Sequence, residues 1–385
     1  MKKKIRIALL TSFDPRDENK LSGSVYHMLG AIERNGCDVT ILGPVPARQF
    51  LAGKLAQRFR QFRRAYNFEH GFFMAHRYAK EFSKRLREQP VDCIFAPRSS
   101  TEIALLKTKI PVVYYSDTTF AALYNYYPWF SNFMPLSEWE GNKIEKAALH
   151  RSQFAVFSSQ WAADSAIREY GIDADRVSIV PMGPNLRKIP ARSSVLRPKD
   201  PGECKLLFIG VEWERKGGQI AYDTYRLLKS KGIQASLTIC GCTPPPYVKD
   251  AGVKVIPYLD KAQGQDYARF EDLLRSHHFF ILPTRAECFG VVFCEASAFG
   301  LPSLATDTGG IPTAVRNGVN GYRFPLEAGA EVYADRIASL FKNYDTQYVP
   351  LCTSARDLFE NELNWDAFAR EMIALFKKAS GNSII

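Results

Sequence analysis

The sequence contains no long hydrophobic run. No stretch of its 385 residues approaches the roughly 18 to 20 consecutive apolar residues that a membrane-spanning helix requires. The opening MKKKIRIALL places lysines before an apolar run, as secretory signals do, but Arg6 interrupts that run and Thr11 follows it. So short a run predicts a buried first strand and not a signal peptide. We therefore expect a cytoplasmic protein.

Metal-binding patterns are also missing from the sequence. The six histidines show no ligand spacing, and Cys240-Gly-Cys242 lacks the second half of a zinc site. The eight cysteines are scattered, mostly in apolar contexts, where cysteine behaves as a small hydrophobic residue. Scattered reduced thiols are typical of cytosolic proteins. We expect no metal site.

A third absence concerns dinucleotide cofactors. A dehydrogenase of the Rossmann type needs G-x-G-x-x-G after its first strand, where this chain has LLTSFDPRDENKLSGS. The sequence therefore argues against that class of enzyme.

The length and composition predict two globular α/β domains. A chain of 385 residues exceeds the usual size of one hydrophobic core, and its 46% hydrophobic and 24% charged residues are ordinary for soluble proteins. Strand-like segments alternate with helical ones, which is the rhythm of a parallel sheet. In the first half they are IRIALL, VTIL, CIFA, VVYYS, FAVFS and VSIV; in the second they are KLLFIG, ASLTIC, VKVIPY, HFFILP, SLAT and GYRF.

The polar, proline-rich segment between the two series is the predicted linker. We place an N-terminal domain at 1–185, the linker at 186–203 and a C-terminal domain at 204–364. Residues 365–385 contain WDAFAREMIALFKK, which has helical periodicity.

The positive charge is concentrated in one segment. Residues 54–87 contain ten Lys or Arg against Glu69 and Glu81, so they contribute +8 of the formal net charge of +11. Aromatic residues are interleaved with these cations, as at a lipid interface. One hypothesis is attachment to the anionic inner face of a membrane. The alternative is two amphipathic helices with aromatics in the core and charges in solvent.

The most informative stretch, Phe279 to Gly321, reads as strand, loop, helix, strand and loop. Glu287 and Glu295 lie eight positions apart across its first loop and helix. Ligands of an open α/β sheet bind outside the carboxyl ends of the strands, so Glu287 is expected in a ligand loop. The alternative is two surface glutamates near a helix start.

These residues resemble a known family. ExFGxxxxEAxAxGxP, TxxGGxP and NG are similar to motifs of the retaining glycosyltransferases of family 4, also called group 1, which have the GT-B fold. FIGVEWERKGG (208–218) and LSGSVYHMLGAIERNGCDV (21–39) resemble the family's phosphate-binding turn and N-terminal glycine loop. The resemblance implies two Rossmann-like doubly wound domains facing across a cleft, with a terminal helix that crosses back to the first domain.

The resemblance also implies roles for the C-terminal motifs. Lys216 would bind the donor diphosphate, a contact that a glycine turn and a helix N-terminus favour. Many relatives have Arg where this chain has Val211, so Arg215 is the expected substitute. Glu287 would hold the donor sugar and Glu295 the ribose, since a carboxylate accepts hydrogen bonds from vicinal hydroxyls. The remaining predicted donor-binding residues are Phe289, Gly290, Gly309 and Gly310.

Two segments of the first domain are candidates for acceptor contact. Ser22-Gly23-Ser24 opens a helix and suits phosphate or acceptor binding, although Ser24 could equally be only an N-cap. Asp117 follows VVYYS, where many relatives have a histidine-containing motif. It could orient the acceptor hydroxyl or take its proton, or it could be a helix cap.

The sequence thus predicts a retaining glycosyltransferase with Glu287, Lys216 and Asp117 in catalytic roles. Its co-substrate would be a UDP- or GDP-sugar bound without a metal, and its acceptor a glycan, a lipid-linked saccharide or a small molecule. No nucleic-acid partner is expected. The alternatives are a sugar-nucleotide epimerase of the same fold and a non-catalytic carbohydrate- or nucleotide-binding protein.

Overall fold

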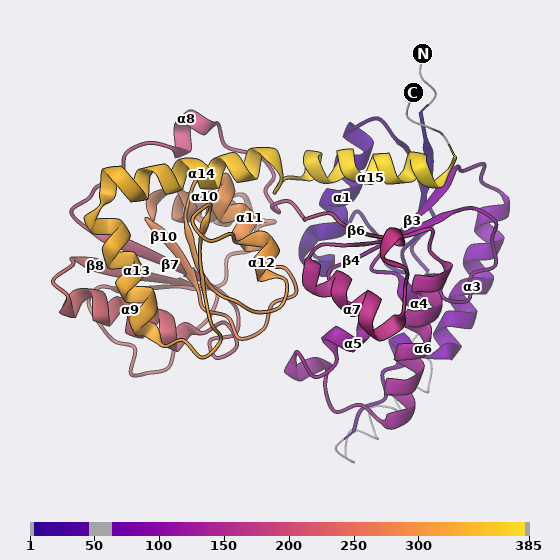
Figure 1. Cartoon of the computed structure of the whole chain (residues 1–385), viewed down its shortest axis with the longest axis horizontal. Coiled ribbons are helices and arrows are strands. Elements are labelled where there is room, and N and C mark those ends of the chain that lie inside the picture. The colour runs from indigo at the N-terminus through magenta and orange to yellow at the C-terminus, as the bar shows by residue number, and fades with distance from the viewer. Residues whose placement is uncertain (1–3, 46–63, 382–385) are drawn as a thin grey trace. The chain divides into compact units, whose positions relative to one another are not determined.

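The computed structural model describes residues 4–45 and 64–381 of the chain. It divides into two compact units (Figure 1): unit 1 is Met1–Pro181 with Trp365–Ile385, and unit 2 is Met182–Asn364. Residues 186–203, the predicted linker, are grouped with unit 2 and include the short helix α8 (Arg192–Val195).

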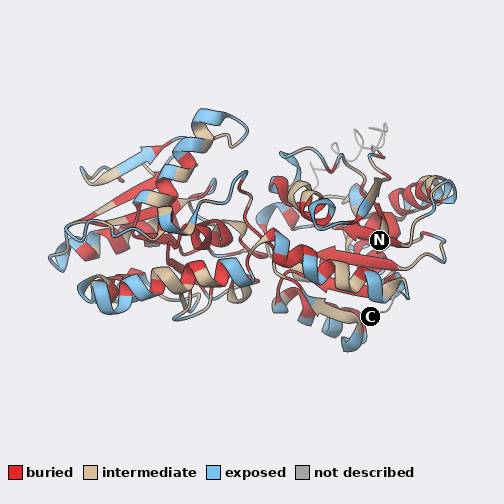
Figure 2. Ribbon diagram, turned by 90° about the horizontal axis from the view of Figure 1, so that it is seen from above, coloured by how far each residue is buried: buried red, intermediate tan, exposed pale blue. Residues whose placement is uncertain are grey.

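Unit 1 is built on a parallel sheet with the strand order β2-β1-β3-β4-β5-β6. The strands are β1 (Arg6–Leu9), β2 (Asp38–Ile41), β3 (Cys93–Pro97), β4 (Val112–Ser116), β5 (Phe154–Phe157) and β6 (Val177–Ile179). Every residue of β3, β4 and β5 is buried, whereas the edge strands β2 and β6 are partly exposed. Central strands of a parallel sheet are covered on both faces, which explains their continuous apolar sequences. Figure 2 shows this burial along the centre of the unit.

The helices of unit 1 connect these strands in βαβ fashion. They are α1 (Ser24–Arg34), α3 (Phe72–Arg87), α4 (Ser100–Ile103), α5 (Phe120–Leu123), α6 (Pro135–Arg151) and α7 (Gln160–Tyr170). Helix α15 (Trp365–Ala379) also belongs to this unit, where it packs against α1. The Phe376 ring of α15 lies 5.3 Å from that of Phe95, and the Phe368 ring lies 5.1 Å from that of Tyr115.

Unit 2 has a second parallel sheet, in the order β12-β11-β10-β7-β8-β9. Its strands are β7 (Cys204–Ile209), β8 (Ala235–Cys240), β9 (Val253–Ile256), β10 (Phe279–Leu282), β11 (Ser303–Thr306) and β12 (Gly321–Phe324). Besides α8, its helices are α9 (Gly218–Ser230), α10 (Gly264–Ser276), α11 (Val291–Ala298), α12 (Ile311–Ala314), α13 (Ala330–Lys342) and α14 (Val349–Asn361). The prediction of two doubly wound α/β units is confirmed.

Candidate functional site

The loop that follows β7 is shaped by two adjacent glycines. Gly217 has a left-handed φ of +75°, and a Cβ there would lie 2.0 Å from the carbonyl oxygen of Pro283. A Cβ on Gly218 would lie 2.2 Å from the Trp213 ring. Both positions therefore require glycine, because a side chain would push this loop away from its neighbours. Lys216 is held directly before them, ahead of the N-terminus of α9.

Hydrogen bonds tie this loop to the one that follows the adjacent strand β10. The carbonyl oxygen of Arg215 accepts from the Arg285 backbone N–H (2.7 Å) and the Thr284 hydroxyl (3.1 Å). In return, the Arg215 guanidinium donates to the carbonyl oxygen of Ala286 at 3.0 Å. The Arg215 guanidinium also pairs with Glu212. Val211, where many relatives have arginine, is 59% exposed. Arg215 thus holds the two loops together.

The structure brings together Lys216 and Glu287, which are 71 positions apart in the sequence. Their side chains form an ion pair, and each is only 14% exposed. The backbone N–H of Gly310 donates to the carbonyl oxygen of Glu287 at 3.1 Å, so the loop after β11 joins the same cluster. Three loops at the carboxyl ends of three neighbouring strands therefore meet here, as expected for a ligand site of an open α/β sheet.

Glu295 lies in a different environment, within α11. Its side chain is 3% exposed, and its Oε1 accepts a hydrogen bond from the Lys261 ammonium at 2.6 Å. Burial raises the pKa of Glu295, while Lys261 and the backbone N–H of Asn185 oppose that rise by stabilising the carboxylate. The alternative of two surface glutamates is wrong for Glu295, because its side chain is buried. A buried carboxylate needs partners such as Lys261.

The glycines near these glutamates shape the same loops. Gly290 (φ +84°) is the N-cap of α11, and a Cβ there would lie 2.6 Å from the Phe293 ring. Phe289, beside it, is buried. Gly309 is left-handed at φ +54° and Gly310 caps α12, which has only four residues.

In unit 1, the chain reaches α1 through three consecutive residues with positive φ: Leu21, Ser22 and Gly23. Gly23 is the N-cap of α1, while Ser24 has helical backbone angles and is buried. The alternative that Ser24 is the N-cap is therefore wrong. The left-handed turn places the cap one residue earlier, at the glycine that tolerates it best.

Asp117 follows β4 and faces Arg98, which follows the adjacent strand β3. The Arg98 guanidinium lies 3.5 Å from Asp117 Oδ2. Oδ1 of Asp117 is buried and has no hydrogen-bond partner among the residues that the structure describes. The capping alternative is wrong, because Thr119 caps α5 by accepting from the Ala122 backbone N–H at 3.2 Å. Arg98 itself has a left-handed φ of +54°, which is strained for a non-glycine residue.

Sequence reasoning missed two of these side chains, Arg98 and Lys261. Arg98 directly follows the strand-like CIFAP, so the rule that ligands gather at strand carboxyl ends could have found it. Lys261 lies in an irregular loop before α10, without a motif, and only the fold brings it to Glu295.

Part of the basic segment 54–87 lies outside the described residues, namely 54–63. Within α3, Tyr78 and Phe82 are buried, as the amphipathic-helix alternative predicts, but Phe73 is 53% exposed. No helix in the described ranges is long and apolar enough to cross a membrane. Across residues 4–45 and 64–381, no three His, Cys, Asp or Glu side chains are grouped as metal ligands.

Comparison with known proteins links both units to one family. Residues 203–343 match a family model described as "Glycosyl transferases group 1", and residues 22–188 match "Glycosyltransferase Family 4". A D-inositol 3-phosphate glycosyltransferase of Paenarthrobacter aurescens is 27% identical over 48% of this chain and 48% of its own length. The D-inositol 3-phosphate glycosyltransferase of Rhodococcus erythropolis is 28% identical over 64% of this chain and 60% of its own length. The matched region thus spans about half of these curated relatives.

Two solved structures show the same fold over nearly the whole chain. Sucrose-phosphate synthase of Thermosynechococcus elongatus has a TM-score of 0.66 at 17% identity, covering 99% of this chain and 100% of its own. The Anabaena protein HepE in complex with UDP has a TM-score of 0.63 at 14% identity, covering 98% and 100%. At such identities the likeness shows the fold alone.

Proposed function

Because the chain belongs to the group 1, or family 4, glycosyltransferases and has their GT-B fold, we propose that it is a retaining glycosyltransferase. It moves a sugar from a nucleotide diphosphate sugar to an acceptor hydroxyl. The observation that carries this proposal is the half-buried Lys216–Glu287 pair at the carboxyl ends of β7 and β10. It joins a cation suited to a diphosphate and a carboxylate suited to sugar hydroxyls.

The donor binds along the loops of unit 2. Lys216 contacts the diphosphate together with the N-terminus of α9, whose free backbone N–H groups favour anions. Arg215 holds this loop against the loop of Glu287, and adds positive charge. Glu287 accepts hydrogen bonds from the sugar, beside Gly309 and Gly310, while Glu295 accepts from the ribose. In this proposal the positive charge needed by the diphosphate comes from the protein, without a metal.

The reaction breaks the bond between the anomeric carbon and the diphosphate oxygen, and forms one to the acceptor oxygen on the same face. The acceptor proton passes to the departing phosphate. Negative charge grows on the diphosphate in the transition state, so Lys216 and the α9 N-terminus stabilise that state more than the ground state.

The acceptor binds to unit 1, at Asp117 and Ser22-Gly23-Ser24. Support comes from Asp117 Oδ1, which is buried without a protein partner in the described structure and can accept from a hydroxyl group. Arg98 orients the other oxygen of the same carboxylate. A glycan, a lipid-linked saccharide and a small metabolite all present such a hydroxyl.

The base of the donor is uracil or guanine in this proposal, and the UDP complex of HepE supports testing uracil first.

The further proposal of a cytoplasmic protein attached to the inner face of an anionic membrane rests on the basic segment 54–87. The exposed rings of Phe73 and Trp139, 53% and 52% exposed, support it. Sedimentation with anionic vesicles tests the attachment: Phe73→Ser/Trp139→Ser should bind less, and equal binding would contradict it.

Nucleotide release from a panel of UDP- and GDP-sugars tests the catalytic proposal. One donor should release its nucleoside diphosphate in the presence of acceptor, and Glu287→Gln should slow this by at least about a hundredfold. Glu214→Gln is the matched control, an exposed glutamate of the loop after β7. Donors that bind without release would indicate a binding protein, and full activity of Glu287→Gln would overturn the proposal.

A further inference from the structure

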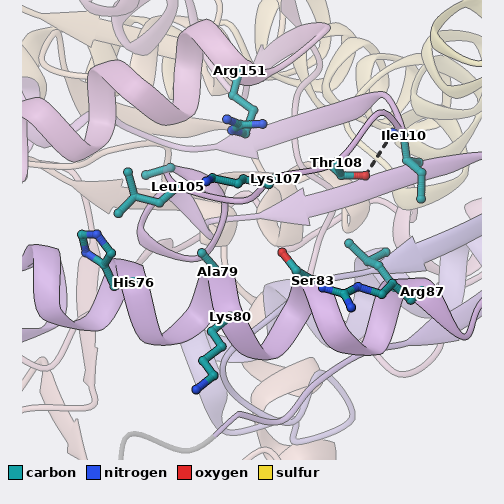
Figure 3. A pocket seen from close by; sticks show the side chains of 12 residues that line it. His76, Ala79, Lys80, Ser83, Arg87, Leu105, Lys107, Thr108, Ile110 and Arg151 are labelled. Carbon is teal, nitrogen blue, oxygen red and sulfur yellow. Dashed lines mark hydrogen bonds between the residues drawn. The ribbon is translucent and has the colours of Figure 1, made fainter.

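Unit 1 also has a concave site beside α3, apart from the candidate site residues discussed above. It is a groove of about 710 Å³ between α3 and residues 104–110, with Arg151 at the end of α6 beside it. This volume is within the range of small-molecule sites, roughly 300–1,000 Å³. Figure 3 shows Ser83 and Arg87 on α3 on one side, with Lys107 and Thr108 on the other and Arg151 beyond them.

The lining is cationic. Lys80, Arg87, Lys107 and Arg151 contribute to it, and none of the lining residues is acidic. None of these four forms an ion pair with a carboxylate among residues 4–45 and 64–381. The ammonium of Lys80 points away from the groove in Figure 3, which leaves three cations around it.

Helix electrostatics explains only part of this arrangement. Arg87 and Arg151 are the last residues of α3 and α6, where the helix dipole favours a positive charge. Lys107, by contrast, lies in the loop that precedes β4, where no helix dipole accounts for its charge. Three exposed cations from three elements line one groove that has no acidic lining residue, so their charges attract an anion.

The floor of the groove is apolar. Leu86 and Ala104 are buried, while Leu105 and Ile110 are half-buried. The turn beneath is fixed by a hydrogen bond of 3.0 Å from the Ile110 N–H to the Thr108 hydroxyl. The groove therefore combines positive charge with an apolar wall, which suits a ligand that carries both an anionic group and an apolar part.

The groove is separate from the proposed acceptor site. Arg87, Lys107 and Arg151 precede β3, β4 and β5, so they lie at the amino ends of these strands. Arg98 and Asp117 follow β3 and β4, at the opposite edge of the sheet. A ligand in the groove would therefore not occupy the reacting centre.

We propose that this groove binds a phosphorylated compound with an apolar part, at a site of its own. The phosphate contacts Arg87, Lys107 and Arg151, whose charge-assisted hydrogen bonds are the strongest such contacts available. The apolar part lies on Leu86, Leu105 and Ile110. A dissolved phosphate ester and the headgroup of an anionic lipid share this chemistry.

Two probes distinguish these sources. Dihexanoyl phosphatidic acid, kept below its micelle concentration, is titrated by calorimetry. Phosphatidylcholine vesicles with and without phosphatidic acid are tested by sedimentation. The test variant is Lys107→Gln/Arg151→Gln, outside the segment 54–87. The matched control, Lys109→Gln/Lys146→Gln, removes the same charge from exposed residues that do not line the groove. Ser83→Glu is a second test variant, which places a carboxylate in the groove.

The wild type should bind at least one probe. Both test variants should weaken that binding by about tenfold or more, while the control stays within about twofold. Binding of the dissolved probe indicates a soluble phosphate ester, and binding of vesicles alone indicates a lipid surface. Failure of the wild type to bind either probe, or equal losses in test and control variants, would overturn the proposal. Nucleotide release by the wild type is independent of this outcome.

Discussion

Glu287 and Glu295 are only eight positions apart in the sequence, but their carboxylates have different surroundings. Glu287 lies in the loop after β10 and pairs with Lys216, a residue expected to bind phosphate. Glu295 is buried in α11 and pairs with Lys261, which lies in the loop before α10. The two pairs predict separate tasks, one toward the sugar and one toward the ribose.

We expect Glu287→Gln to bind free nucleoside diphosphate at least as tightly as the wild type, because that ligand has no sugar and the variant releases Lys216 from its ion pair. Glu295→Gln should weaken the same ligand by about 1.5–3 kcal/mol, the contribution of a hydrogen bond to a charged group. Calorimetry of both variants measures the difference. Equal losses of diphosphate affinity would show that the roles are wrongly assigned.

At the scale of elements, α6 carries a buried glutamate that the sequence did not single out. Glu145 is 3% exposed, and the Tyr114 hydroxyl donates to its Oε1 at 3.2 Å. Burial raises its pKa to about 7, although hydrogen bonds from Ser100 and Tyr114 oppose the rise. The folded state therefore keeps the proton of Glu145 at pH values where the unfolded chain has lost it.

This residue should make unit 1 less stable as the pH rises from about 4.5 to about 7. In that window the folded state binds more protons than the unfolded state, so raising the pH favours unfolding. A shift of this size corresponds to about 3 kcal/mol. Glu145→Gln should flatten the slope of unfolding free energy against pH, measured by denaturant titration. The control Glu33→Gln, on an exposed position of α1, should keep it; an unchanged slope in Glu145→Gln would contradict the assignment.

The strands and loops show which features could be predicted from the sequence and which could not. The buried strands were predictable because parallel strands are apolar throughout, and Glu287 and Lys216 were predictable because both lie in loops after such strands. The pairs with Lys261 and Arg98 were not predicted, since they form between loops that only the tertiary fold brings together. The cap at Gly23 was missed because a left-handed turn shifts the start of α1 by one residue. The cap at Thr119 was missed because α5 begins after two further residues that follow Asp117 in an extended or irregular backbone.

For the whole molecule, the division into two units assigns the C-terminal helix to unit 1. Phe376 is fully buried against Phe95, so Phe376→Ala should destabilise unit 1 by about 3–5 kcal/mol. Hydrogen exchange should then accelerate in β3 and β4 while β7 and β10 keep their protection. Glu371→Ala, exposed on the same helix, should change neither. Faster exchange in β7 and β10 alone would contradict the assignment.

The proposed reaction requires a diphosphate bound at Lys216. The most direct test is calorimetry of the full chain with UDP and GDP and with uridine and guanosine. In Lys216→Gln, affinity for the preferred diphosphate should fall at least about tenfold, while affinity for its nucleoside stays within about twofold. Lys231→Gln, an exposed lysine paired with Asp335, should behave as the wild type. Unchanged diphosphate affinity in Lys216→Gln, or an equal loss for the nucleoside, would contradict a donor site at the β7 and β10 loops.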